Sequence, residues 1–67
     1  AGALYDRLAE AAQRLSRGEG GTLKPLSLSA SKLRRIATDR PRELARYLDA
    51  PALERFGEAF AELIAEA

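Results

Sequence analysis

The sequence predicts an all-α domain, and three features lead to this fold class. Valine is absent, so the alternation of β-branched and aromatic residues that strands require does not occur. Alanine, leucine, arginine and glutamate, which form helices readily, dominate the chain. In residues 51–67, apolar residues recur along one side of a helix: Leu53, Phe56, Phe60, Leu63 and Ile64. We therefore expect a compact bundle of four to five short helices.

The first helix is expected from about Ala3 to Ser16. Its apolar stripe consists of Leu4, Leu8, Ala11, Ala12 and Leu15. The glycines of residues 18–21 should end it, because glycine tolerates positive φ and loses much backbone entropy in a helix. Pro25 disfavours helix at the residue before it, so residues 22–28 should be extended. The leucines of this segment are expected to anchor it to the core: Leu23, Leu26 and Leu28.

The second helix should begin after Leu28, with the Ser29 hydroxyl accepting a hydrogen bond from the amide of Ser31 or Lys32. Its expected buried stripe is Ala30, Leu33, Ile36 and Ala37. Residues 38–41 should break this helix. A short third helix is predicted from about Pro41 to Leu48, and it should bury Leu44, Leu48 and part of Tyr47.

The last helix should begin near Asp49–Pro51, with Asp49 or Ala50 near its cap. It is expected to carry the largest share of the core, because both phenylalanines of the chain lie in it. Gly57 should weaken this helix by roughly 1 kcal/mol relative to alanine. We interpret it as the site of a kink or of a close approach by a neighbouring helix.

Length and composition exclude several classes of function. Residues 1–67 are enough for a single domain, which we expect to be part of a longer chain. Histidine and cysteine are absent, so the serines have no imidazole to activate them, and the common zinc ligands are missing. No phosphate-binding glycine motif and no membrane-spanning run occurs. We therefore expect no enzyme activity, no cofactor, no metal and no membrane partner.

Charge is distributed unevenly along the chain. Residues 1–48 carry a net charge of +5, and residues 49–67 carry −4. The basic residues of adjoining segments form a candidate patch for nucleic-acid phosphates: Lys24, Lys32, Arg34, Arg35, Arg40, Arg42 and Arg46. The alternative is that these side chains are simply solvated and pair with Asp39, Glu43 and the acidic last helix.

Four glutamates recur at every fourth position of the last helix: Glu54, Glu58, Glu62 and Glu66. Like charges at this spacing destabilise an isolated helix by about 0.2–0.5 kcal/mol per pair, and only Arg55 lies nearby to offset them. One interpretation is a solvated face made of a good helix former. The other is an inter-domain face that repels DNA and contacts a basic surface of the parent protein.

Three segments in order resemble the HRDC domain, the helicase and RNase D C-terminal module. They are residues 28–37 (LSASKLRRIA), Arg40-Pro41, and residues 53–60 (LERFGEAF). Members of that family show FSDATLREMA, a short helix after a proline, and KLERYG or KLERFG followed by a phenylalanine. With the first helix aligned as well, the resemblance covers nearly the whole chain, and the LERFG segment is its most specific part.

The resemblance implies a helical accessory domain of a bacterial RecQ-type DNA helicase, in the cytoplasm at the nucleoid, with a role in DNA repair and recombination. Such a domain would be a monomer in isolation, bind single-stranded or branched DNA weakly, and contact other domains of its helicase. Two alternatives remain open. One is a protein–protein interaction bundle without a nucleic-acid role, and the other is an RNA-binding accessory domain of an RNase D-like exonuclease.

The chain departs from the family pattern in two places. The family has a GVGxxK turn before LERFG, whereas here only residues 49–52 separate Leu48 from Leu53. The family also often has an aromatic residue in the loop before the second helix, and the aligned position here is Pro25. The first departure removes a turn whose backbone amides can approach a phosphate. The second removes an aromatic ring, and stacking on such a ring is worth roughly 1–3 kcal/mol per base. The remaining basis for DNA binding is the positive charge of the basic side chains.

Overall fold

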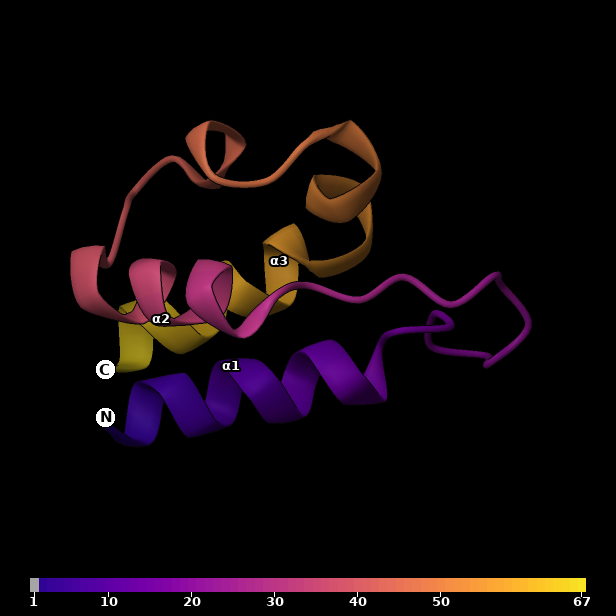
Figure 1. Cartoon of the computed structure of the whole chain (residues 1–67), viewed down its shortest axis with the longest axis horizontal. Helices are drawn as coiled ribbons and strands as arrows, with labels where there is room; N and C mark the ends of the chain where they lie inside the picture. Colours follow the sequence, from indigo (N-terminus) through magenta and orange to yellow (C-terminus); the bar gives the residue numbers. More distant parts are fainter. Residues whose placement is uncertain (1) are drawn as a thin grey trace.

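A computed structural model describes residues 2–67, and Ala1, the first residue of the predicted domain, lies outside them. Residues 2–67 contain no strand. Their elements are α1 (Ala3–Arg14), α2 (Ala30–Asp39), the 3₁₀ turn η1 (Leu44–Arg46) and α3 (Ala50–Glu66). Helix α1 packs against both α2 and α3, and α3 also packs against η1 (Figure 1). The all-α class is confirmed, whereas the described chain has fewer helices than the four to five predicted.

One hydrophobic core lies between these elements. It consists of Leu4, Leu8, Ala11, Ala12, Leu15, Leu33, Ile36, Leu44, Leu48, Ala52, Phe56 and Phe60. The predicted stripe of α1 is therefore buried in full, as are the central residues of the other predicted stripes. No polar or charged side chain within residues 2–67 is buried. Every described charged side chain is thus at least partly exposed.

The loop after α1 differs from the prediction in how its leucines are used. Leu26 and Leu28 are half-buried against the core, but Leu23 is 49% exposed and does not anchor the loop there. Its side chain lies over Gly18, where a Cβ atom would come within 2.7 Å of Leu23 Cδ1. The loop is held instead by its backbone, since the amides of Leu23 and Leu26 donate to the carbonyls of Arg17 and Ser16.

Helix α2 begins as its sequence predicts. Ser29 has extended φ/ψ angles and its Oγ accepts a hydrogen bond from the Lys32 amide at 3.2 Å, which satisfies one of the free donors of the first turn. Leu33 and Ile36 are buried and Ala37 is half-buried. Ala30 is exposed, so the prediction that it belongs to the buried stripe is wrong. It lies in the first turn, before the helix reaches its partner.

The predicted third helix, Pro41–Leu48, is reduced to η1. Arg40 ends α2 in the left-handed region, with φ 48° and ψ 56°, because the proline that follows disfavours the right-handed helical region. Glu43 is extended, so a regular helix cannot begin before Leu44. The expected burial is nevertheless confirmed: Leu44 and Leu48 are buried, and Tyr47 is half-buried. Two leucines one turn apart are enough to attach this short turn to the core.

Helix α3 carries the two largest buried side chains. Asp49 caps it by accepting from the Ala52 amide at 3.1 Å, and Pro51 lies in its first turn. Phe56 and Phe60 are fully buried and stacked, with ring centroids 5.6 Å apart and an interplanar angle of 20°. Leu53, Leu63 and Ile64 are half-buried at the edges of the core. Helix α3 thus supplies the two largest fully buried side chains, whereas α1 and its C-cap supply more of the buried core residues, so the larger share predicted for α3 is limited to its two rings.

Gly57 does not mark a close approach of another helix. A Cβ atom built there would meet only the Leu53 side chain of the same helix, at 3.0 Å from its Cδ1. That methyl group is the end of a flexible, half-buried side chain, so it can move by the few tenths of an ångström required.

We therefore predict that Gly57→Ala stabilises the domain by about 0.5–1 kcal/mol, the gain in helix propensity. The same change at Gly18 should destabilise it by more than about 1 kcal/mol, because Gly18 has a φ of +80° and Leu23 occupies the space for a Cβ. Urea unfolding followed by circular dichroism compares the two variants. A loss of stability in Gly57→Ala would contradict the assignment of its contact to Leu53 alone.

In the part of the chain that the structure describes, no helix combines the length and the apolar character needed to cross a membrane.

Candidate nucleic-acid interface

Two cations lie on the exposed side of α2, in the first six residues of the helix. Because Leu33 and Ile36 take the buried side, Lys32 and Arg35 point away from the core, one helical turn apart. They line an open groove of about 680 Å³ that we call the α2–η1 groove. The other residues lining it are Ser29, Ser31, Asp39, Arg46 and Tyr47. Three of the seven predicted basic residues therefore meet at one site.

Tyr47 is fixed at the edge of this groove by a hydrogen bond. Its hydroxyl donates to Asp39 Oδ2 at 2.6 Å, which ties the segment after η1 to the last turn of α2. This hydrogen bond, together with the negative charge of the carboxylate, raises the pKa of Tyr47 above its usual value of 10.0. The positive charges of Arg35 and Arg46 act in the opposite direction on this pKa.

The raised pKa of Tyr47 gives a pH-dependent prediction. The stability that the neutral phenol contributes is present below pH 10.0 and is lost as the pH rises through the higher pKa of the folded state. In a Tyr5→Phe background, Tyr47 is the only tyrosine, so absorbance reports its ionisation alone. We expect Asp39→Ala to move this titration to lower pH. An unmoved midpoint would show that the hydrogen bond to Asp39 does not govern the phenol.

A smaller groove of about 300 Å³ lies on the other side of Arg46 and Tyr47. It is lined by these two residues and by Pro41, Arg42 and Glu43. Arg46 Nε lies 3.7 Å from Glu43 Oε2, but both side chains are highly exposed, at 82% and 75%. An exposed ion pair of this kind contributes little to the stability of the fold. Arg46 is therefore free to bind another anion, and Arg42 becomes a fourth predicted cation in this region.

The remaining predicted cations lie elsewhere. Arg34 and Arg40 line a groove between the ends of α1, α2 and α3, together with Arg7, which is not among the seven predicted residues. The guanidinium carbon of Arg34 lies 6.0 Å from the centre of the Tyr5 ring, a cation–π contact that orients it toward α1. The structure thus does not bring all seven basic residues to one groove, because α2 is exposed on two sides.

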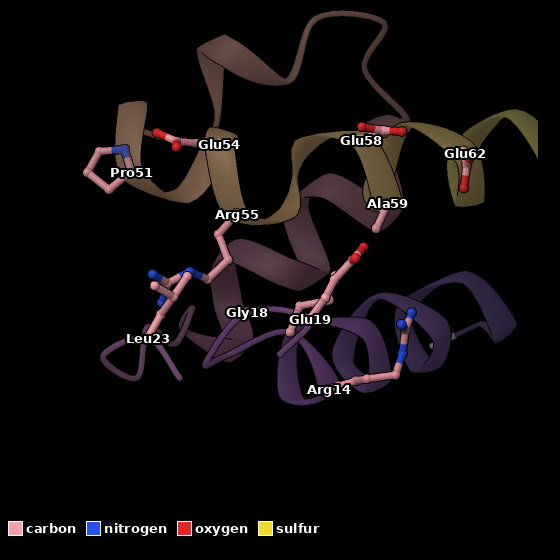
Figure 2. Close-up of a pocket in the computed structure, with 11 residues that line it drawn as sticks. Arg14, Gly18, Glu19, Leu23, Pro51, Glu54, Arg55, Glu58, Ala59 and Glu62 are labelled. Atoms are coloured by element: carbon pink, nitrogen blue, oxygen red, sulfur yellow. The ribbon is translucent and has the colours of Figure 1, made fainter. Parts of the chain in front are cut away.

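Lys24 accepts a hydrogen bond through its backbone carbonyl. Arg55 Nη1 donates to the Lys24 carbonyl at 2.5 Å and to the Ser16 carbonyl at 2.8 Å, so one guanidinium connects α3 to the end of α1 and to the following loop. In Figure 2 the Arg55 side chain runs from α3 toward the loop that carries Leu23. In the sequence, Arg55 stands out only as a neighbour of the glutamates. Its structural role depends on two carbonyls distant in sequence, which no local pattern indicates.

The four glutamates of α3 do not form one face. Glu54, Glu58 and Glu62 line a groove of about 430 Å³ together with Arg14 and Glu19, and Figure 2 shows them along one side of the helix. Glu66 lines the separate groove near the two ends of the described chain. Residues four apart advance by about 40° around an α-helix, so three such steps turn the row by roughly 120°.

The groove lined by Glu54, Glu58 and Glu62, which we call the acidic groove, has no lining residue in common with the α2–η1 groove. Each groove has an excess of one sign: four glutamates against two arginines in the acidic groove, and three cations against Asp39 in the α2–η1 groove. Comparison of the chain with protein-family models, with curated proteins and with solved structures gave no match.

Proposed function

We propose that this chain is an HRDC-type, non-catalytic accessory domain of a RecQ-type DNA helicase. In this proposal it binds single-stranded or branched DNA weakly, through charge, and modulates the DNA binding and unwinding of its parent enzyme. The observation that carries the proposal is the convergence of Lys32, Arg35 and Arg46 on one open groove, with Arg42 next to it.

The charges of the α2–η1 groove favour a polyanion. Its three cations face one carboxylate, Asp39, and that carboxylate already accepts the hydrogen bond from Tyr47. At the start of α2, Ser29 caps the Lys32 amide, while the preceding amides of the first turn point toward the same end of the helix. Phosphate groups bind to such a combination of cations and helix start. Four cations without a deep, enclosed site support weak binding that does not depend on sequence.

The segments that resemble HRDC domains provide the framework of this site. Residues 28–37 form the cap and nearly all of α2, which carry Lys32 and Arg35. Residues 53–60 lie in α3, where Phe56 and Phe60 build the core on which η1 packs. The resemblance therefore falls on the residues that position the groove as well as on the residues that line it.

The acidic groove supplies the regulatory part of the proposal. Glu54, Glu58 and Glu62 repel DNA and contact a basic surface elsewhere in the parent helicase. Glu58→Lys in the parent helicase is expected to change its DNA affinity, and Glu10→Lys, at an exposed position of α1, is the control because it changes the net charge by the same amount. Unchanged DNA affinity and unwinding in Glu58→Lys would leave only a solvated face.

The proposed function is tested by fluorescence anisotropy with labelled single-stranded DNA, forked DNA and single-stranded RNA of equal length. We expect micromolar or weaker binding of single-stranded and forked DNA at low salt. The absence of DNA binding at low salt would favour a protein–protein interaction bundle. A clear preference for RNA over DNA would favour the accessory domain of an RNase D-like exonuclease.

A further inference from the structure

Arg46 and Tyr47 separate two open grooves. Both residues line the α2–η1 groove and also the smaller groove with Arg42, so the two grooves meet at them. We call these two residues the Arg46–Tyr47 ridge. A ligand that spans both grooves must cross it, and would meet a guanidinium and an aromatic ring next to each other.

The Tyr47 side chain is held at two points, because it is half-buried against the hydrophobic core and its hydroxyl donates to Asp39. Its backbone is anchored as well, since the Tyr47 amide donates to the Leu44 carbonyl at 2.9 Å. Tyr47, which lines both grooves, is therefore ordered before any ligand arrives. A ring that is already ordered loses little conformational entropy when it stacks on a planar group.

The cations on both sides of the ridge are free for phosphates. Within the described residues, the only ion pair of this region joins Arg46 to Glu43, and it is highly exposed. Lys32 and Arg35 lie in one groove and Arg42 lies in the other, so positive charge is available before and after the ring. A charged chain with planar groups attached at regular intervals fits this order of cation, ring and cation.

We propose that single-stranded DNA crosses the Arg46–Tyr47 ridge, with one base stacked on the Tyr47 ring and the flanking phosphates in the two grooves. This inference rests on the proposed function and adds a stacking contact to its electrostatic binding. A duplex keeps its bases stacked on each other and has no free base face for Tyr47. The ridge therefore makes the domain prefer single-stranded DNA over duplex DNA.

The test uses the 67-residue chain and a labelled oligothymidylate, with affinity measured by fluorescence anisotropy. Tyr47→Leu is expected to lower the affinity about tenfold, because it removes the stacking surface, whereas Tyr47→Phe should stay within about twofold. Arg7→Gln, which removes an exposed charge away from the ridge, serves as the matched control for Arg46→Gln. We expect Arg46→Gln to weaken binding clearly and Arg7→Gln to change it little. Circular dichroism confirms that each variant is folded.

A second measurement reports on the ring itself. In a Tyr5→Phe background, oligothymidylate should quench the fluorescence of Tyr47, and an abasic oligomer of the same length should not. Salt-sensitive binding that Tyr47→Leu leaves unchanged, or that Tyr47→Phe weakens as much as Tyr47→Leu does, would overturn the ridge and leave the proposed function standing. A wild-type domain that binds no DNA at low salt would overturn both.

Discussion

Phe60→Ala is expected to lower the free energy of unfolding by about 3–5 kcal/mol, which approaches the whole stability of so small a domain. Phe60 is fully buried and stacked on Phe56, so its removal leaves a cavity in the single core of the described chain. At roughly 0.05–0.15 kcal/mol per residue, a chain of 67 residues has about 3–10 kcal/mol in total. We therefore expect the variant to be largely unfolded or to melt far below the wild type.

Thermal and urea unfolding, followed by circular dichroism, measure this loss. Glu62→Ala is the matched control, because it truncates an exposed residue of the same helix and should change stability by less than about 0.5 kcal/mol. A Phe60→Ala variant that melts with the wild type would mean that α3 does not supply the centre of the core.

Arg35→Glu is expected to abolish detectable DNA binding by the isolated domain. Arg35 lines the α2–η1 groove together with Lys32 and Arg46, so the substitution removes one cation and places a carboxylate beside the phosphates. Non-specific complexes already have dissociation constants of about 10⁻⁴–10⁻⁶ M, so a loss of tenfold or more takes them out of the measurable range. The Arg35 side chain also makes no hydrogen bond or salt bridge within residues 2–67, so the fold should be unaffected.

The matched control for Arg35→Glu is Arg7→Glu, which changes the net charge of the chain by the same amount. Arg7 is exposed on the first turns of α1, where a glutamate is compatible with the helix dipole. We expect it to reduce affinity only modestly, through long-range repulsion. Equal losses in both variants would show that DNA responds to net charge and not to the groove.

Local patterns predicted the parts of the fold that local physics determines. The stripe of α1, the Ser29 cap and the Asp49 cap follow from side-chain spacing and from hydroxyl or carboxylate groups at helix starts, and all are present. The third helix was over-predicted because leucine spacing fits both a helix and a single 3₁₀ turn. The positive φ of Arg40 before Pro41 and the extended Glu43 decide between them.

The sequence predicted which basic residues are exposed, but not which of them lie together in one groove. Periodicity correctly placed Lys32 and Arg35 on an exposed side of α2. It could not show that Arg46 joins them, because that depends on the path of the chain from Arg40 to η1. Arg34 is one position from Arg35, yet it lies over Tyr5 of α1, a contact between elements distant in sequence.

The decisive measurement is the salt dependence of oligothymidylate affinity. It tests whether DNA binds electrostatically to the α2–η1 groove and to the smaller groove with Arg42. If Lys32, Arg35, Arg42 and Arg46 each neutralise one phosphate, the slope of log affinity against log salt should be about −3 for single-stranded DNA. Affinity would then fall about 50-fold between about 50 mM and about 200 mM salt. An affinity that stays constant across this range, or no binding at the lowest salt, would show that these grooves do not bind DNA through charge.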